Sequence, residues 1–290
     1  MKTCSLEQAD KHEFAVHQVI YSNADIEMWY DWHTRLNDTK FTDQCYWVQC
    51  GEDRIGGVIK LDDTIMHLFV IPPFTDRQQL WEMLLACCQD IRYMNGVLQE
   101  DVPILLALGF EVVVTRQVMC CPASNSRKLE LPPGFSLHPI DDSIQLSAFI
   151  QPMRDGYQGG VDQKAFGARH DGKIMEDLAY LMKVYQHRNL SIYMMNEQNR
   201  EIVGLCLAGI YENMPLGFAE IAEICVVPSY RSKGLAAFML HHVKQSASAD
   251  TDVVKLCVTM GNDAERLYKK AGFQAGPPFA RMKKSSNHIG

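Results

Sequence analysis

The second half of the chain alternates between short apolar runs and amphipathic segments. Runs rich in apolar and β-branched residues predict strands over 191–196, 202–211, 218–227 and 253–259. Apolar residues spaced three and four apart predict helices over 141–151, 173–187 and 235–245, the last burying Leu235, Phe238, Met239 and His242. This order of elements indicates a mixed α/β (α+β) fold.

A further short helix is predicted over 262–271. Asn262 suits its N-cap, and Glu265 three residues later completes a capping box. Gly272 ends the helix, and Phe273 and Phe279 belong to a closing strand-like segment.

The first half of the chain reads as a distant copy of the second. Ile71-Pro72 matches Val227-Pro228, and Met83-Leu84 matches Met239-Leu240, both at an offset of 156 residues. Ile55–Val58 reads like Ile202–Leu205, and Gly109-Phe110 matches Gly272-Phe273 at an offset of 163. Four matches in the same order indicate a duplication. The difference of 163 − 156 = 7 residues is expected in the loop after the intervening helix.

A polar, proline-marked segment separates the two halves. We expect a linker over 122–129 between a first domain over 1–121 and a second over 130–290.

The net negative charge lies in the first half. Residues 1–128 hold 11 Lys and Arg against 18 Asp and Glu, a net of −7, whereas residues 129–290 hold 17 of each sign. Such a chain is a poor partner for a polyphosphate backbone, so we expect no nucleic-acid partner. The neutral second half would receive an anionic small molecule better than the first.

Cysteine and histidine spacing argues against a metal site. The chain has ten residues of each type but no CxxC and no HExxH. We expect no metal, and reduced cysteines that pack as small apolar residues. No apolar stretch approaches the roughly 18 residues that span a bilayer, and the first residues lack a signal core. A cytoplasmic protein without a membrane partner is the expectation.

Candidate chemistry concentrates in residues 227–236, where a strand ends, a short basic loop follows and a helix begins. Gly234 and Ala236 keep the first helical turn free of bulky side chains. That turn has free N–H groups and a partial positive charge, so an anion can approach the backbone. Arg231 and Lys233 add positive charge, which predicts a pyrophosphate site, although neither a Walker loop nor GxGxxG is present.

Arg231-x-x-Gly234-x-Ala236 resembles the acetyl-CoA signature of the GNAT superfamily of N-acetyltransferases. Residues 262–273 resemble the second family motif, with Asn262, Ala264, Tyr268 and Gly272-Phe273 in their usual places. The resemblance covers 130–290 strongly and 1–121 only as a degenerate copy. This layout is similar to that of mycothiol synthase, with no feature that assigns its substrate.

The resemblance implies two tandem GNAT-like domains, each a mixed, mostly antiparallel sheet flanked by helices. It implies acetyl transfer from acetyl-CoA, as co-substrate, to an amine by direct attack in a ternary complex. It assigns cofactor binding to Cys225, Val226, Val227, Arg231, Ser232, Lys233, Gly234, Leu235, Ala236, Asn262, Ala264 and Tyr268. A backbone N–H from Cys225–Val227 would be the oxyanion donor.

The reaction needs a base, because a free amine of pKa about 10 is protonated at neutral pH. Several family members place a glutamate eleven residues before the signature arginine, and Glu220 has that spacing from Arg231. Glu223 is the alternative base; regular strand alternation would place it on the opposite face.

Tyr268 is expected to be the acid that protonates the leaving thiolate. It shares one helix face with Ala264, Leu267 and Ala271, and Asn262 would bond the pantetheine amides. Cys225 is expected to pack rather than act as a nucleophile, because the sequence locates no histidine partner for it.

The first half has lost these positions. Thr64, Thr75, Gln78 and Leu80 stand 156 residues before Glu220, Arg231, Gly234 and Ala236. Leu105 stands 163 residues before Tyr268. We therefore expect no acetyl-CoA site in the first domain.

Residues 141–190 are expected to line the acceptor side, with Tyr157, Asp162, His170 and Asp171 as polar candidates. The function predicted first is N-acetylation of a small-molecule amine. A protein or peptide N-acetyltransferase and a non-catalytic coenzyme A-binding module are the alternatives. The sequence leaves the acceptor, the acyl-chain preference and the oligomeric state open, and a monomer is compatible with it.

Overall fold

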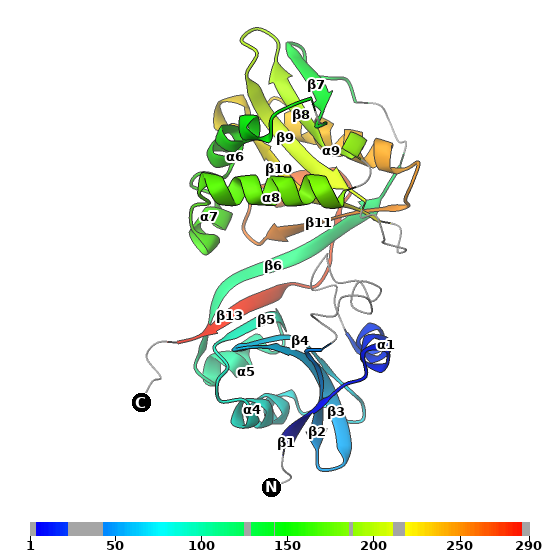
Figure 1. Ribbon diagram of the computed structural model, residues 1–290, viewed down its shortest axis with the longest axis vertical. Coiled ribbons are helices and arrows are strands. Elements are labelled where there is room, and N and C mark those ends of the chain that lie inside the picture. The colour runs from blue at the N-terminus through cyan, green and yellow to red at the C-terminus, as the bar shows by residue number, and fades with distance from the viewer. Residues whose placement is uncertain are drawn as a thin grey trace. The chain divides into compact units, whose positions relative to one another are not determined.

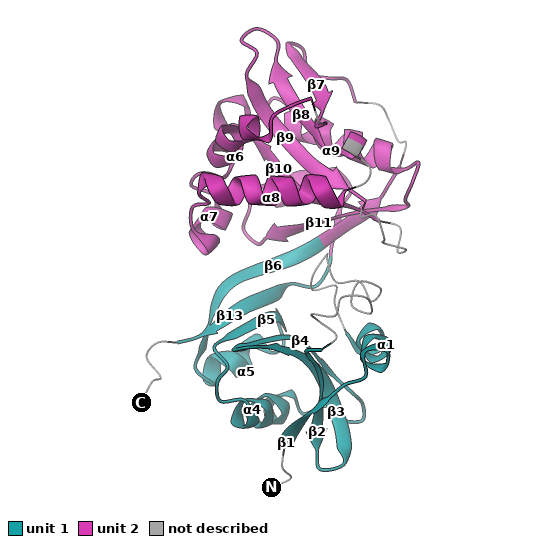
Figure 2. Cartoon of the chain, in the orientation of Figure 1, with its two compact units in different colours: residues 1–118, 276–290 teal, residues 119–275 magenta. Residues whose placement is uncertain are grey.

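The computed structural model describes residues 4–22, 43–124, 129–141, 143–185, 188–210 and 218–285. The chain divides into two compact units (Figure 2). Unit 1 holds residues 1–118 and 276–290, and unit 2 holds residues 119–275.

Unit 1 is a twisted sheet with helices on both faces (Figure 1). Its strands run in the spatial order β1-β2-β3-β4-β5-β13-β6. The elements are β1 Cys4–Gln8, α1 Lys11–Tyr21, β2 Cys45–Cys50, β3 Asp53–Leu61, β4 Thr64–Val70, α4 Arg77–Cys87, β5 Tyr93–Leu98, α5 Val102–Ala107, β6 Phe110–Pro122 and β13 Phe279–Lys284. β4 and β5 are parallel, and the other neighbours of unit 1 pair antiparallel.

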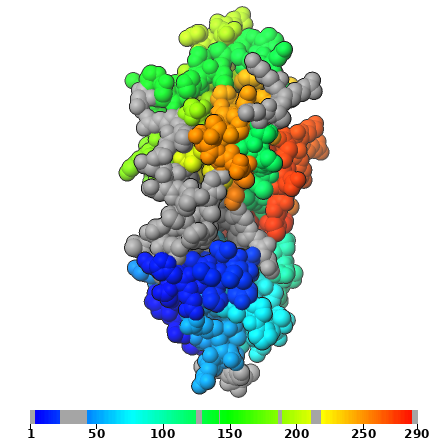
Figure 3. Space-filling view, turned by 90° about the vertical axis from the view of Figure 1, so that its right-hand side faces the viewer, coloured from blue at the N-terminus to red at the C-terminus, as the bar shows by residue number. Residues whose placement is uncertain are grey.

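Two apolar clusters hold the helices of unit 1 to its sheet. On one face, Leu80, Trp81 and Leu84 of α4 are fully buried with Met94 of β5. On the other, Phe14 of α1 packs with Trp47 and Phe69. The outer side of α1 leaves Val16, Val19 and Ile20 exposed, and this helix contributes to the dark blue surface in Figure 3.

Unit 2 is likewise a sheet with helices on both faces. Its strands run from the end of β6 through β11-β10-β9-β8-β7, and β12 pairs with β6 through Gln274 and Ala275. The elements are β7 Phe135–Pro139, η1 Leu146–Phe149, α6 Ile150–Tyr157, α7 Val161–Phe166, α8 Asp171–Val184, η2 Arg188–Leu190, β8 Ile192–Asn196, β9 Ile202–Gly209, β10 Phe218–Val226, η3 Pro228–Tyr230, α9 Leu235–Ala247, β11 Val253–Thr259, α10 Ala264–Lys270 and β12 Gln274–Ala275. The β10–β11 pair is parallel.

Helices cover both faces of the unit 2 sheet. Cys225 and Leu205 face α6 and α8, and a Cβ on Gly156 of α6 would lie 2.7 Å from the Cβ of Cys225. The next pair along the strands, Val226 and Gly204, faces Met239 of α9. Successive strand residues point to opposite faces, so α6 and α9 lie on opposite sides of the sheet.

The unit boundaries fall at 118/119 and 275/276, not at the linker expected over 122–129. The reason is strand connectivity. β6 begins in unit 1 and continues past residue 118 into unit 2, and the last strand of the chain, β13, inserts between β5 and β6 of unit 1. Ala280 and Met282 of β13 are fully buried in the unit 1 core.

Most predicted elements of the second half are present. The predicted strands correspond to β8, β9, β10 and β11, and the predicted helices over 173–187 and 235–245 to α8 and α9. Three details differ. The helix predicted over 141–151 is replaced by η1 and α6, β7 was not predicted, and α9 buries Leu235, Met239, Leu240, Val243 and Ala247 instead of Phe238 and His242. Which of the apolar positions of α9 are buried depends on its packing against the sheet, which periodicity alone does not set.

The start of α10 differs from the predicted capping box by one residue. The Asn262 side chain accepts from the N–H of Ala264 at 3.0 Å, while Glu265 accepts from the N–H of Gly261 at 2.7 Å rather than from that of Asn262. The Gly261 backbone, at φ +83°, turns its N–H toward the helix.

The duplication holds at the level of elements, but the residue offset differs. The helix starts align Gly234 with Asp76, an offset of 234 − 76 = 158. From the strand-ending proline to the N-cap there are 234 − 228 = 6 positions in unit 2 and 76 − 72 = 4 in unit 1. Part of the extra length therefore lies in the loop before the helix, not only after it.

None of the helices in the part of the chain that the structure describes is long and apolar enough to cross a membrane.

The position of β13 leads to a stability prediction. Deleting residues 279–290 should unfold unit 1, because the sheet would lose a strand that pairs with β5 on one side and β6 on the other. Met282→Ala should lower the free energy of unfolding by about 2–5 kcal/mol, as for other buried methionines. Urea denaturation measures both effects. Removing residues 286–290 alone is the control. Unchanged stability without β13 would contradict the assignment of this strand to the core of unit 1.

Candidate functional site

The candidate site centres on β10, which parts from β11 halfway along its length. The parallel register joins Phe218–Ile221 to Val253–Leu256, and in the described residues it stops there although β10 continues to Val226. On its other side β10 stays paired with β9 as far as Val226. One edge of residues 222–226 is therefore open, so backbone groups on that edge can bind a ligand.

A β-bulge on the same strand changes which side chains share a face. The register shifts between Ile221 and Glu223, so Glu220 lies opposite Gly209 and Glu223 opposite Leu207. Both glutamates therefore lie on the face covered by α6 and α8. The prediction that alternation separates them was wrong, because the bulge inserts one residue between them.

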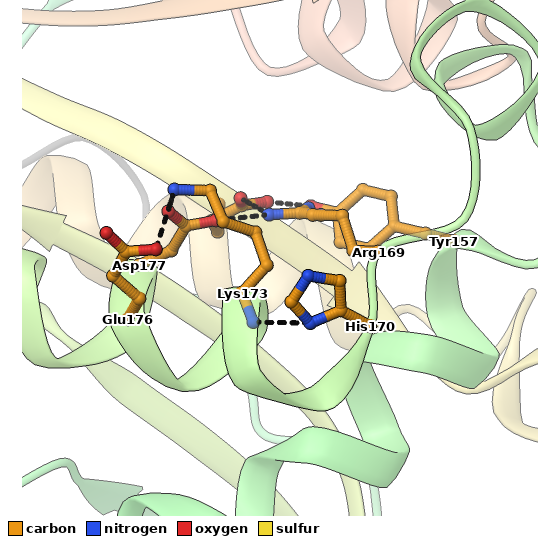
Figure 4. A network of polar contacts seen from close by, with 7 residues as sticks. Tyr157, Arg169, His170, Lys173, Glu176 and Asp177 are labelled. Carbon is orange, nitrogen blue, oxygen red and sulfur yellow. Dashed lines mark hydrogen bonds and ion pairs between the residues drawn. The ribbon is translucent and has the colours of Figure 1, made fainter.

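Tyr157, Arg169 and Asp177 belong to a network of polar contacts (Figure 4), and Glu223 joins this network through Tyr157 and Arg169. Its Oε2 accepts from the Tyr157 hydroxyl, and its Oε1 accepts from Arg169 Nη1 at 2.6 Å. The same Arg169 nitrogen lies 3.5 Å from Asp177 Oδ2, and Lys173 Nζ lies 3.0 Å from Asp177 Oδ1. The Arg169 guanidinium also lies over the Tyr157 ring, 4.9 Å from its centroid. The network connects α6, α8 and the bulge of β10.

This environment sets the protonation of its members. Burial raises the pKa of Tyr157 well above its ordinary value, and the Glu223 charge raises it further. Desolvation opposes the charged form of Arg169, but Glu223 outweighs it and raises the pKa of that guanidinium. At neutral pH the tyrosine is therefore a hydrogen-bond donor and the arginine a cation.

Glu220 differs from Glu223 in exposure. Glu220 is completely buried, on the stretch of β10 that still pairs with β11 through Lys255. The side chain of Glu223 is 16% exposed, at the point where β11 has already diverged. Only Glu223 reaches the surface in this conformation.

The backbone amide directed into the opening belongs to Val226. The Val227 N–H donates to Val203 O at 2.9 Å, so it is committed to β9. Because successive strand N–H groups alternate between sides, the Val226 N–H and C=O point away from β9. Consistent with this, the Val226 carbonyl accepts from Arg231 Nε at 3.2 Å. Of the backbone N–H groups in the predicted range Cys225–Val227, the Val226 N–H is the one that points to the open edge.

The loop after β10 leads into a helix start that no side chain of the described residues caps. Gly234 stands at the N-cap of α9 with φ +83°, and Ser232 before it has φ +62°. The first helical bond runs from Phe238 N to Gly234 O, which leaves the N–H groups of Leu235 and Ala236 without an intrahelical acceptor. Leu235 anchors this turn because its side chain is buried. The N–H groups of this first turn therefore point out of the helix end, and the anion site predicted here stays a prediction.

The two cations of the loop do not act alike. Arg231 donates to the Gly156 carbonyl at 2.7 Å as well as to Val226, so it ties the loop to α6. Lys233 Nζ lies over the rings of Tyr230 and Phe135, at 5.1 and 5.8 Å. Lys233 is exposed in the loop that precedes the helix start, whereas much of the Arg231 guanidinium serves to shape the loop.

Tyr268 of α10 is buried, with 7% of its surface exposed. Burial raises the pKa of its phenol, and the acidic groups Cys206, Asp162, Glu223 and Cys225 raise that pKa further. Tyr268 therefore keeps its proton at neutral pH and can act as a donor.

Asp162 of α7 joins the ends of two other elements. Its Oδ1 accepts from Thr259 Oγ1 at 2.6 Å, and its Oδ2 accepts from Asn262 Nδ2 at 3.2 Å. Both donors are neutral. Asn262, predicted to bind pantetheine, is thus already bonded to Asp162 through its amide nitrogen and to the Ala264 N–H through its oxygen.

Cys225 is enclosed by α6. Its thiol lies 3.8 Å from the Pro152 carbonyl, and burial raises its pKa to about 12. A thiol with that pKa is protonated at neutral pH and is a poor nucleophile.

The structure separates the predicted acceptor-side residues. Tyr157 and Asp162 reach the site, whereas His170 caps α8 by accepting from Lys173 N at 3.1 Å and Asp171 pairs with Arg154 on the surface. Sequence reasoning missed Arg169, Asp177 and Thr259. Only Asp177 had a sequence signal, its i,i+4 spacing from Lys173.

Unit 1 keeps the parted strands but not the open helix end. β4 and β5 pair only as far as Met66 and Asn95, and a cavity of about 290 Å³ opens beyond, lined in part by Leu68, Val70, Arg77 and Leu98. Asp76 caps α4 by accepting from Gln79 N at 2.9 Å. Arg77 is neutralised by Asp101 at 2.6 Å and Glu100 at 3.2 Å. A helix start with a carboxylate on it does not suit a phosphate.

Among the described residues, no group of three or more His, Cys, Asp or Glu side chains is arranged to hold a metal ion.

Part of the chain is similar to a known protein family. Residues 161–273 match the family described as the acetyltransferase (GNAT) family. A search of curated proteins found no match.

Solved structures share the fold over nearly the whole chain. A GCN5-related N-acetyltransferase from Sphaerobacter thermophilus has a TM-score of 0.69 at 14% identity, covering 97% of this chain and 95% of that one. A tandem GNAT protein from the clavulanic acid biosynthesis pathway has 0.56 at 13%, covering 96% and 97%. A GNAT-family acetyltransferase from Colwellia psychrerythraea has 0.59 at 11%, covering 98% and 100%. Unit 2 therefore carries an acetyltransferase domain of the GNAT family, and the chain as a whole has the fold of tandem GNAT proteins.

Proposed function

We propose that this protein is an acetyl-CoA-dependent N-acetyltransferase that acts on an amine of a small molecule. The observation that carries the proposal is the uncapped amide end of α9, joined by one short loop to the strand β10 where it has parted from β11. These features suit the two ends of one extended, anionic cofactor. The family match supports acyl transfer as the reaction class.

In the proposed complex, the pyrophosphate of acetyl-CoA accepts from the N–H groups of Leu235 and Ala236, and Lys233 adds charge. The pantetheine arm extends along the open edge of β10, where the Val226 N–H and C=O point away from β9. The same N–H is our oxyanion donor for the thioester carbonyl. Asn262 must release Asp162 if its amide nitrogen is to bind pantetheine.

The amine attacks the thioester directly, in a ternary complex. A carboxylate on β10 takes the ammonium proton, and Glu220 is our first candidate because of its spacing from Arg231. Glu223 is the alternative: it is the more exposed of the two, and Tyr157 and Arg169 hold its oxygens. Both lie on one face of β10, so one acceptor position could serve either.

Tyr268 is the proposed acid for the departing thiolate. Its raised pKa keeps the proton on the phenol at neutral pH, so the hydroxyl can donate a hydrogen bond to the sulfur and supply its proton as the C–S bond breaks.

The charge near Tyr268 favours a cationic acceptor. Within the described residues Asp162 accepts from two neutral donors, and no Lys or Arg among those residues pairs with its negative charge. A protonated amine would be attracted there.

A protein or peptide amine is the alternative acceptor, and a module that binds coenzyme A without catalysis is the alternative function. The ten free cysteines are consistent with our proposal of a cytoplasmic, reducing location.

For unit 1 we propose a structural role without a cofactor. Asp76 occupies the helix start, and Arg77 is neutralised.

Binding of acetyl-CoA should therefore depend on Gly234. Wild-type protein should bind one acetyl-CoA per chain in titration calorimetry, and Gly234→Glu should abolish binding by adding a side chain and a negative charge at the phosphate position. Gly134→Glu is the matched control, because Gly134 has a similar φ of +80° and nothing within 4 Å of a Cβ. Normal affinity in Gly234→Glu would remove the site from α9, and two sites per chain would contradict the role proposed for unit 1.

Tyr268→Phe should leave acetyl-CoA binding nearly intact and lower kcat by roughly 10²–10⁴, the range for loss of a general acid. Thiol release under saturating substrates measures kcat, and calorimetry measures binding. Tyr193→Phe, the same change on β8, should have no such effect. Equal losses of kcat in the two variants would mean that Tyr268 is only a part of the core.

Glutamine variants should identify the base by pH dependence. The base works deprotonated, so the wild-type rate should rise with pH through its pKa. The variant lacking the base should lose that limb and recover at high pH, as the amine deprotonates itself. We expect this of Glu220→Gln. If only Glu223→Gln behaves so, Glu223 is the base, and if neither profile changes, no carboxylate on β10 serves.

A further inference from the structure

Unit 1 brings several thiols together that are far apart in the sequence. Cys4 lies on the edge strand β1, and Cys87 is the last residue of α4. Their Sγ atoms are 3.5 Å apart, and the Sγ of Cys88 lies 3.9 Å from that of Cys87. Cys50 stands opposite Cys4 in the β1–β2 register. All four are free thiols.

From this geometry we propose that Cys4 and Cys87 form a reversible disulfide that fastens the edge strand β1 to α4. A disulfide needs its sulfurs about 2.05 Å apart, so the pair must approach by about 1.5 Å, which side-chain rotation can supply. α4 packs against β1 along this contact, and Cys4 lies against the core of unit 1. The backbones are therefore held close before any bond forms.

Exposure favours this pair over the other combinations. Cys87 is exposed and Cys4 is partly exposed, so a small oxidant can reach both. Cys50 and Cys88 are buried, at 6% and 5% exposure. A bond between the adjacent Cys87 and Cys88 would close a strained ring.

The thiols also differ in reactivity. The hydrogen bond between the Cys4 and Cys87 thiols lowers the pKa of Cys4. The same interaction raises the pKa of Cys87 to about 11. Cys4 is therefore the thiol that ionises first and attacks.

The oxidant we name is a low-molecular-weight disulfide such as oxidised glutathione. The Cys4 thiolate attacks one of its sulfurs, and one glutathione thiolate leaves. Cys87 then loses its proton to solvent and attacks the Cys4 sulfur, and the second glutathione leaves. Two protein thiols are oxidised and one glutathione disulfide is reduced to two thiols, so atoms and electrons balance.

The consequence is structural and does not depend on the proposed acetyl transfer. β1 ends the sheet of unit 1 and pairs only with β2 on the described strands. Edge strands open more readily than central ones. A bond across residues 4 and 87 would hold this strand in place.

The test uses full-length protein incubated with oxidised glutathione and then alkylated. Trypsin should release the peptide of residues 3–11 joined to that of residues 78–92, with the mass of the pair lowered by two hydrogens and with dithiothreitol restoring both. Cys4→Ser and Cys87→Ser should each abolish the joined species. Cys88→Ser, Cys50→Ser and Cys120→Ser, the last at an exposed thiol of unit 2, should retain it.

Three outcomes would overturn the proposal: no joined peptides in folded wild-type protein, a bond confined to residues 78–92, or glutathione retained on Cys87 without closure. Proteolysis gives a second measurement. Oxidised wild-type protein should resist cleavage near residue 8 more than reduced protein, and Cys4→Ser should show no such difference. Equal cleavage of oxidised and reduced wild-type protein would show that no bond holds β1.

Discussion

The parting of β10 from β11 is the constraint on which the chemistry of unit 2 depends. While both edges of a strand are paired, its backbone groups are satisfied and cannot bind a ligand. Here β10 keeps β9 on one side and loses β11 on the other after Ile221, so the Val226 N–H points to the open edge and its carbonyl is left to accept from Arg231. The bulge at the same point turns Glu223 onto the face of Glu220 and brings it to Tyr157 and Arg169.

The loop and helix that follow depend on this opening. Arg231 fastens the loop to the Val226 and Gly156 carbonyls, which fixes where α9 begins. Gly234 supplies a left-handed backbone at that point, and none of the described side chains accepts from the free amides of the first turn. Unit 1 shows the other outcome: its strands part in the same way, but Asp76 caps α4 and Arg77 is neutralised. The strand geometry is shared, and the charge at the helix start distinguishes the two units.

The two compact units do not follow the order of the chain. Unit 1 is completed by β13 from the end of the chain, and unit 2 by the end of β6. A boundary placed from composition alone, at the polar segment after Cys121, separates strands from the sheets they complete. Buried pairing, not linker composition, defines the compact units.

Local signals in the sequence determined much of this protein. Periodicity located β8 to β11, α8 and α9, and the spacing of Arg231, Gly234, Ala236 and residues 262–273 indicated the GNAT family before any fold was known. These features are encoded within a few residues of one another, where backbone preference and capping act. Only the tertiary structure decided on which face of β10 the Glu223 side chain lies. One residue inserted at the bulge reverses the alternation of side chains along the strand, and such a bulge leaves no mark in composition. It also decided the partners Arg169 and Asp162 and the place of β13, because contacts across many residues follow from how helices and strands pack.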